Sequence, residues 1–200
     1  MAEEIISDMT LEEKVGQMFL VRYTDDEKAV SDIDKYKFGG YLLFAKDFQD
    51  KTKDDVIKSV SDCQSASKVP LFIGVDEEGG IVNRVSKFPQ FRNEPFKSPR
   101  ELYNEGGYEL ISSDTQEKCE LLKSLGINVN LAPVCDVSEN PDSFMYERTL
   151  GQDADATSEY VSSVVEVMSK NNMGSALKHF PGYGDNGDTH TDIITDNRPI

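Results

Sequence analysis

The chain has only two histidines, His179 and His190, and both lie in one short segment near its end. An imidazole has an ordinary pKa of about 6.5, so it can release and recover a proton near neutral pH. Asp188 stands two residues before His190, where it can fold back onto the ring and fix its tautomer. Taken alone, the pair fits either a proton-transfer site or two polar residues in a solvated loop.

Lys178 adds a cation to the same segment. It precedes His179 near the end of a short apolar run, residues 174–180, and a glycine-rich loop follows. Burying an ammonium beside an apolar strand is costly unless a carboxylate or a ligand pairs with it. The segment therefore indicates polar chemistry at the end of a strand.

Three earlier apolar runs, residues 39–45, 69–75 and 127–133, also give way to polar side chains. These side chains are Lys46, Asp47, Asp76, Glu77, Glu78 and Asp136. The carboxyl ends of parallel strands meet at one edge of a sheet, which is where α/β proteins carry their sites. We expect the candidate residues to gather at that edge.

The elements that must position these residues alternate between strand and helix. Apolar runs predict strands at 19–23, 39–45, 69–75, 127–133 and 174–180, and helical periodicity predicts helices at 25–37, 51–67, 100–124 and 153–171. A capping box, Thr10 to Glu13, marks an earlier helix. Strands that are apolar on both faces and alternate with helices are typical of a parallel sheet flanked by helices. The prediction is an α/β fold, a TIM-type (β/α)8 barrel of which about the first five βα units are present. A self-contained, doubly wound sheet of five strands is its structural rival.

Composition limits the class of protein. The 200 residues carry a net charge of −16, which argues against nucleic acid or an anionic membrane as a partner. No apolar run approaches the roughly 20 residues of a membrane-spanning helix. The acidic N-terminus is no signal peptide as written, so we expect a cytoplasmic protein, or an exported one whose leader has been removed. The three scattered cysteines, Cys63, Cys119 and Cys135, are expected to be buried free thiols.

Six motifs occur in one order along nearly the whole chain. They are Leu11 to Gln17, Gly39-Gly40, Asp76 to Gly80 with Arg84, Asn130 to Val137, Glu147 to Gly151, and Lys178 to Gly182 with Asp188 to His190. Together they resemble glycoside hydrolase family 3 in its β-N-acetylglucosaminidase (NagZ-like) branch. The resemblance implies that residues 1–200 form the N-terminal portion of a single TIM-barrel domain that is truncated at its C-terminal end.

The resemblance also implies how a sugar is held. Asp76 matches a carboxylate that accepts hydrogen bonds from sugar hydroxyls, and Arg148 matches an arginine that grips the same sugar. Lys178 and His179 match a pair that contacts the hydroxyls from the end of the fifth strand. The implied partner is a carbohydrate, and no cofactor or metal is implied.

The catalytic residues implied by the resemblance are His190 and Asp188, which match a His/Asp dyad that acts as general acid and base. The nucleophilic aspartate of the family lies further downstream, and no residue of this chain matches it. The implied activity is that of a retaining β-N-acetylhexosaminidase, which removes terminal β-linked N-acetylglucosamine from peptidoglycan or chitin-type saccharides. We expect the 200 residues alone to be inactive.

The chain departs from the family pattern at two places. Gly182-Tyr183-Gly184 stands where the family often has Gly-His-Gly, and the loop that leads to His190 is about one residue shorter than its commonest form. Glu77 also replaces a commoner glutamine, a minor change. The departures leave Asp188 and His190 in place. They affect how far His190 can extend toward a bound substrate.

Other functions fit parts of the sequence. A metal-dependent α/β hydrolase would use His179 and His190 with Asp185, Asp188 and Asp192. The literal G-x-G-x-x-G pattern at residues 182–187 lacks a following helix, which argues against dinucleotide binding. A β-glucosidase of the same family and a fragment that only binds sugar are further alternatives.

Overall fold

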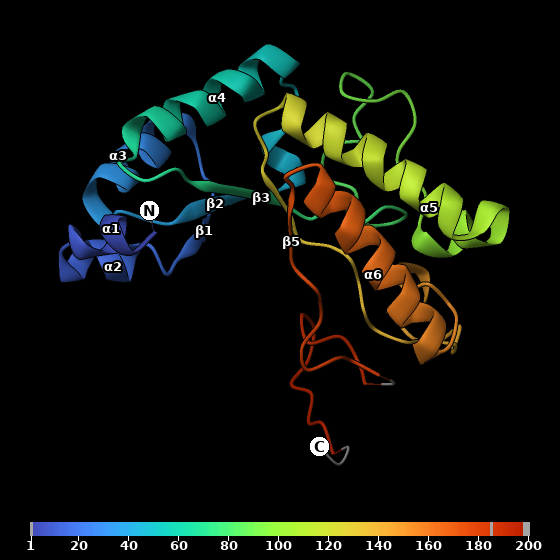
Figure 1. Cartoon of the computed structure of the whole chain (residues 1–200). Helices are drawn as coiled ribbons and strands as arrows, with labels where there is room; N and C mark the ends of the chain where they lie inside the picture. The colour runs from blue at the N-terminus through green and yellow to red at the C-terminus, as the bar shows by residue number, and fades with distance from the viewer. Residues whose placement is uncertain (1, 185, 198–200) are drawn as a thin grey trace.

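The computed structural model describes residues 2–184 and 186–197 of the chain. Within this part, five strands form one sheet flanked by helices (Figure 1). The strands are β1 (Leu20–Arg22), β2 (Gly40–Leu43), β3 (Phe72–Val75), β4 (Val129–Asn130) and β5 (Gly174–Ser175). The helices are α1 (Ala2–Ser7), α2 (Leu11–Gly16), α3 (Asp26–Tyr36), α4 (Lys53–Ala66), α5 (Pro99–Ser124) and α6 (Ala154–Lys170), with short 3-10 turns η1 (Ala45–Asp47) and η2 (Tyr146–Arg148).

The order of the strands decides between the two expected architectures. All neighbouring strands are parallel, and they lie in the sequence order β1-β2-β3-β4-β5. A doubly wound sheet reverses its strand order at a switch point, whereas a barrel adds each strand beside the preceding one. The doubly wound alternative is therefore wrong. The α/β prediction is confirmed, with the strand order of the first five units of a TIM-type barrel.

Sequence signals at the helix ends explain where the helices begin. The predicted capping box is present at α2, where the Glu13 backbone N–H donates to Thr10 Oγ1 and the Glu13 carboxylate accepts the Thr10 backbone N–H. Ser98 and Glu101 cap α5 in the same way, with proline at its first position. Helix α5 is kinked at Gly106 and Gly107, whose backbone angles are not helical.

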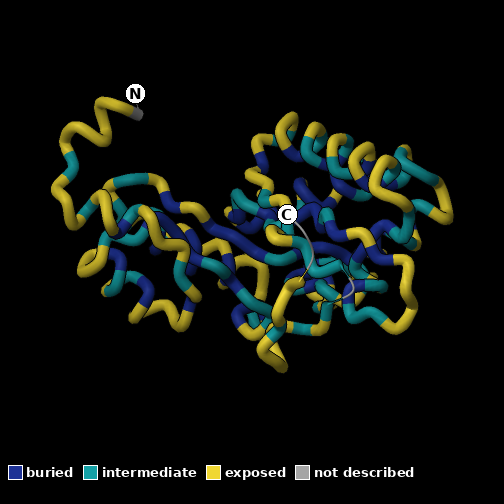
Figure 2. The backbone as a smooth tube through the Cα atoms, turned by 90° about the horizontal axis from the view of Figure 1, so that it is seen from below, coloured by how far each residue is buried: buried dark blue, intermediate teal, exposed yellow. Residues whose placement is uncertain are grey.

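The helices cover one face of the sheet. Tyr41, Leu43, Ile73 and Val75 are buried on this face, and α3 packs with α4 while α5 packs with α6. Figure 2 shows the buried segments running through the strands and along one side of each long helix. This layer is the hydrophobic core.

The opposite face of the sheet is not covered by helices. Leu20 and Phe72 lie in register with Gly40 between them, and these two residues are 42% and 62% exposed. Alternation along a strand sends these residues away from the helices. In a (β/α)8 barrel this is the face that points inward.

Strands β4 and β5 are shorter than the apolar runs that predicted them. Beyond β5 the chain still follows the β4 side, because the Lys178 backbone N–H donates to the Pro133 carbonyl and Val134 pairs with Lys178 in a single parallel bridge. Pro133 has no N–H to donate, so the regular ladder is interrupted at this residue and resumes only as the single bridge.

All three cysteines are free; Cys63 and Cys119 are buried, and Cys135 is half-buried. The described residues include no helix with the length and apolarity that crossing a membrane requires.

Candidate active site

The edge predicted from the sequence is where Lys178 meets two carboxylates. Its Nζ lies 2.6 Å from Asp76 Oδ1 and 2.5 Å from Glu78 Oε1. Asp76 and Glu78 follow β3, whereas Lys178 follows β5. The Glu78 side chain is only 2% exposed. The half-buried ammonium is thus paired, as its position beside an apolar strand requires.

Glu78 also holds Arg148 through a two-pronged contact. Arg148 donates from Nε to Glu78 Oε2 at 2.9 Å and from Nη2 to Oε1 at 2.8 Å. Burial raises the pKa of Glu78, but the hydrogen bonds and charges of Arg148 and Lys178 outweigh it and leave the pKa below its ordinary value. Glu78 therefore remains an anion between two cations.

Glu78 was not among the site residues predicted from the sequence, although its motif was noted. Side chains that follow a strand alternate in direction, so Asp76 and Glu78 face Lys178 while Glu77 faces the other way. Glu77 is fully buried and accepts the backbone N–H groups of Arg84, Val85 and Ser86. The alternation of side-chain directions could have identified Glu78 from the sequence, but only if the last residue of β3 had been known.

His179 lies between Asp136 and Arg148. Its Nδ1 is 2.6 Å from Asp136 Oδ2, and its Nε2 is 3.3 Å from Arg148 Nη2. An arginine side chain can only donate, so Nε2 accepts and the ring proton of neutral His179 sits on Nδ1, facing Asp136. This contact sets the tautomer of the ring.

Asp136 is the second site residue that sequence reasoning missed. Its side chain is 1% exposed, and it also accepts the backbone N–H groups of His179 and Tyr183. Burial raises the pKa of Asp136, but the hydrogen bonds from His179 and Tyr183 outweigh it and hold the pKa below its ordinary value. The sequence signals were its place after an apolar run and its inclusion in the motif Asn130 to Val137.

His190 and Asp188 form a separate, exposed pair. Asp188 Oδ1 lies 2.6 Å from His190 Nδ1 and also accepts the His190 backbone N–H, so the expected fold-back of Asp188 is present. Both hydrogen bonds lower the pKa of Asp188. The His190 side chain is 75% exposed, which leaves Nε2 open to a ligand.

Tyr183 connects this pair to the polar residues at the strand ends. These residues, the strand-end cluster, are Asp76, Glu78, Asp136, Arg148, Lys178 and His179. Its ring packs edge-on against His179 at 4.9 Å between centroids, and its hydroxyl lies 2.7 Å from Thr189 Oγ1. Thr189 stands between Asp188 and His190 in the chain. The tyrosine that departs from the family pattern is therefore the contact between the two groups.

The residues of the metal hypothesis that the structure describes form no group of metal ligands. Among the side chains that the structure describes, no group of three or more His, Cys, Asp or Glu is arranged to hold a metal ion. Asp185, one of the aspartates in that hypothesis, lies outside the described residues.

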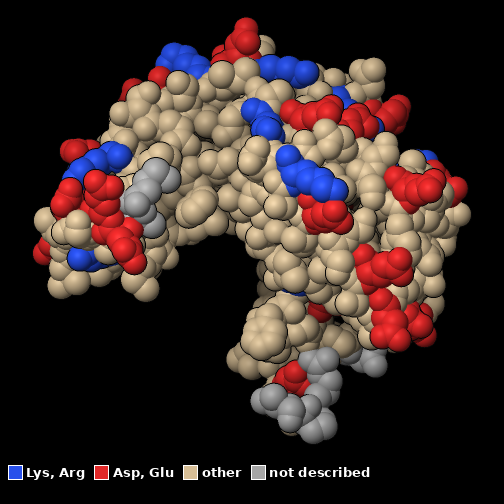
Figure 3. Space-filling view, viewed as in Figure 1, with Lys and Arg blue, Asp and Glu red and all other residues tan. Residues whose placement is uncertain are grey.

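One face of the molecule is unevenly charged. On the face shown in Figure 3, acidic side chains gather toward the two ends of the molecule. The hollow between these ends is lined largely by residues that are neither basic nor acidic.

Comparison with known proteins shows the family. The glycosyl hydrolase family 3 N terminal domain matches residues 10–200, and the chain belongs to this family. It is 33% identical over 168 residues to beta-hexosaminidase A of Pseudoalteromonas piscicida, with 82% of this chain and 27% of the relative covered. It is 28% identical over 185 residues to beta-hexosaminidase LpqI of Mycobacterium tuberculosis, with 92% of this chain and 46% of the relative covered.

A solved structure gives the same result for the fold. The family 3 beta-N-acetylglucosaminidase of Paenibacillus sp. str. FPU-7 superposes with a TM-score of 0.80 at 27% identity, over 90% of this chain and 35% of that one. The chain thus spans less than half the length of these relatives. The predicted family is confirmed.

Proposed function

We propose that this chain supplies the sugar-binding edge and the general acid/base of a retaining β-N-acetylhexosaminidase, as the N-terminal portion of a single family 3 domain. The observation that carries the proposal is the joining of Asp76, Glu78, Arg148, Lys178 and His179 at the carboxyl edge of the sheet. The names of the relatives support hexosaminidase activity over glucosidase activity.

The cluster has donors and acceptors to spare for sugar hydroxyls. An ammonium has three N–H donors, and Lys178 directs two of them to Asp76 and Glu78. Asp76 offers its second carboxylate oxygen. Arg148 and His179 complete a ring of polar groups whose geometry is fixed by Glu78 and Asp136, so little reorganisation is needed when a pyranose binds.

His190 is suited to proton transfer at the glycosidic oxygen. Its Nδ1–H donates to Asp188, so Nε2 exchanges the proton. In the first step of a retaining reaction, a carboxylate nucleophile forms a covalent glycosyl-enzyme while His190 protonates the departing oxygen. In the second step, His190 takes a proton from the water that releases the sugar. The nucleophile is not assigned to a residue of this chain.

The substrate we propose is terminal β-linked N-acetylglucosamine in peptidoglycan or chitin-type saccharides. The test is hydrolysis of an aryl β-N-acetylglucosaminide by the protein at a length that completes a barrel of about 250 residues or more. We expect turnover that His190→Ala abolishes, that chelators leave unchanged, and that Lys170→Met, at an exposed ion pair, also leaves unchanged. Full activity of His190→Ala, or loss of activity with a chelator, would overturn the proposal.

A further inference from the structure

A second lysine, Lys118 of α5, is buried behind the strand-end cluster. It is 7% exposed, and its Nζ lies 3.0 Å from Asp114 Oδ2. The same ammonium lies 5.0 Å from the centroid of the Phe96 ring. Nothing in the proposed chemistry uses this cation, yet keeping a lysine buried is costly without a specific partner.

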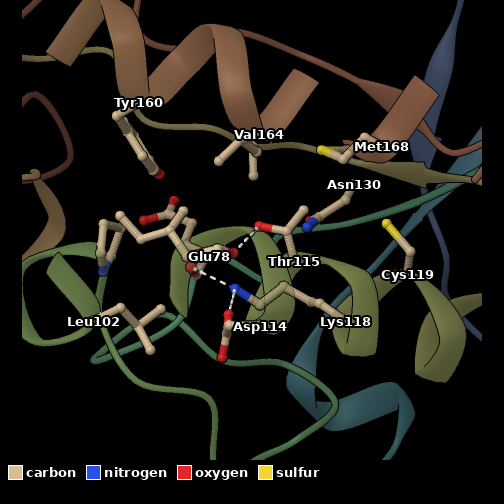
Figure 4. Close-up of a pocket in the computed structure, with 13 residues that line it drawn as sticks. Glu78, Leu102, Asp114, Thr115, Lys118, Cys119, Asn130, Tyr160, Val164 and Met168 are labelled. Atoms are coloured by element: carbon tan, nitrogen blue, oxygen red, sulfur yellow. Dashed lines mark hydrogen bonds and ion pairs between the residues drawn. The ribbon is translucent and has the colours of Figure 1, made fainter. Parts of the chain in front are cut away.

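The third contact of Lys118 gives it a role. Its Nζ donates to the backbone carbonyl of Glu78 at 3.2 Å, as the dashed lines in Figure 4 show. The adjacent Gly79 has a backbone φ of +103°, and a Cβ added there would lie 3.6 Å from the ammonium. Lys118 therefore touches the turn that carries Glu78.

Glu78 is thus held at both ends. Lys118 binds its backbone carbonyl, and Lys178 and Arg148 bind its carboxylate. Figure 4 shows the Lys118 side chain reaching toward Glu78 from α5, with apolar residues of α6 on the other side of the pocket. An apolar side chain at position 118 would fill the space but could not donate to the carbonyl.

We propose that Lys118, oriented by Asp114, is a positioning residue that sets where Glu78 presents its carboxylate, and through Glu78 sets the place of Lys178 and Arg148. The inference rests on the proposed function for its effect on sugar binding. Its effect on Glu78 itself is independent of that function.

The test separates positioning from stability. Lys118→Met alone leaves the Asp114 carboxylate buried without its cation, so this variant is expected to be destabilised. The double variant Lys118→Met/Asp114→Leu removes both charges, and a buried pair replaced by apolar residues commonly keeps or regains stability. We expect the double variant to be as stable as the unmodified protein but to bind N-acetylglucosamine about 3- to 10-fold more weakly, because the hydrogen bond to the Glu78 carbonyl is lost.

A second measurement needs no sugar. Arg148 and Lys178 hold the pKa of Glu78 low against its burial. A displaced Glu78 carboxylate would lose part of these contacts. The carboxyl ¹³C signal of Glu78 should therefore titrate at higher pH in the double variant than in the unmodified protein, whether or not N-acetylglucosamine binds.

Lys170→Met serves as the matched control, because Lys170 pairs with Glu166 on the surface and touches no site residue. All variants are measured in the protein at its full natural length. If the double variant restores both stability and the Glu78 titration to normal, Lys118 is only structural and the inference fails. If the unmodified protein does not bind or cleave the sugar but the Glu78 titration shifts as expected, the proposed function fails and the positioning role stands.

Discussion

Asp136 Oδ2 accepts from both the ring Nδ1 of His179, at 2.6 Å, and the His179 backbone N–H, at 3.0 Å. One carboxylate oxygen thus fixes the orientation of the side chain and the position of its main chain together. Because Nδ1 carries the proton, Nε2 can accept from Arg148. The arginine and the histidine are compatible only in this tautomer.

Asp136→Asn should disturb this arrangement without a change in size. The amide can donate to Nδ1, which would move the ring proton to Nε2 and set it against the Arg148 N–H. We expect kcat/KM for an aryl N-acetylglucosaminide to fall about tenfold or more, because substrate-holding groups lose their alignment. The ¹⁵N signals of the His179 ring report the tautomer directly. Asp142→Asn, at an exposed position, is the control. An unchanged tautomer with unchanged activity would contradict the assignment.

Tyr183→Phe should loosen the segment that carries His190. The ring contact with His179 is kept, but the hydrogen bond to Thr189 is lost. We expect kcat to fall about 2- to 10-fold with little change in KM, because the loss concerns proton transfer rather than sugar binding.

Thr189→Val removes the same hydrogen bond from the other side and provides a double-mutant cycle. The kcat of the double variant should be no lower than that of the more impaired single variant. Effects that simply add would show that the two hydroxyls act separately.

Acid should weaken the Glu78 network. The pKa of Glu78 in the folded protein lies below its ordinary value, so the unfolded state takes up this proton first. The contribution of Glu78 to stability is full above about pH 4.3, the ordinary pKa of glutamate, and is lost as the pH falls through the folded pKa.

Glu78→Gln removes this dependence. At neutral pH the variant should be less stable by about 3 kcal/mol, because Arg148 and Lys178 lose a buried anion, and its stability should fall less steeply in acid. Urea unfolding between pH 3 and pH 7 measures both effects. The free energy of unfolding of a small protein falls by about 1–3 kcal/mol per M of urea. Glu166→Gln, at an exposed pair with Lys170, is the control. If the stability of Glu78→Gln still fell steeply in acid, the loss of stability would have to come from other carboxylates.

The sequence predicted the meeting of Asp76 and Lys178, because both follow apolar runs and parallel strands end at one edge. It did not predict Glu78 or Asp136 as site residues, because their orientation depends on where each strand ends and how the next turn folds. The apolar run at 174–180 predicted a full strand, but Pro133 on the neighbouring segment removes the donor that a longer ladder needs. The roles assigned to His190 and Asp188 stay predictions, although their hydrogen bond is present.

The divergent directions of Glu77 and Glu78 make this stretch intolerant of a change in length. One residue inserted between Val75 and Asp76 would move Glu77 into the place of Glu78, beside Lys178. It would also bring the shorter Asp76 to the backbone donors of residues 84–86 and displace Glu78 from the site. Insertions and deletions at residues 76–78 are therefore closed to this chain in the course of divergence.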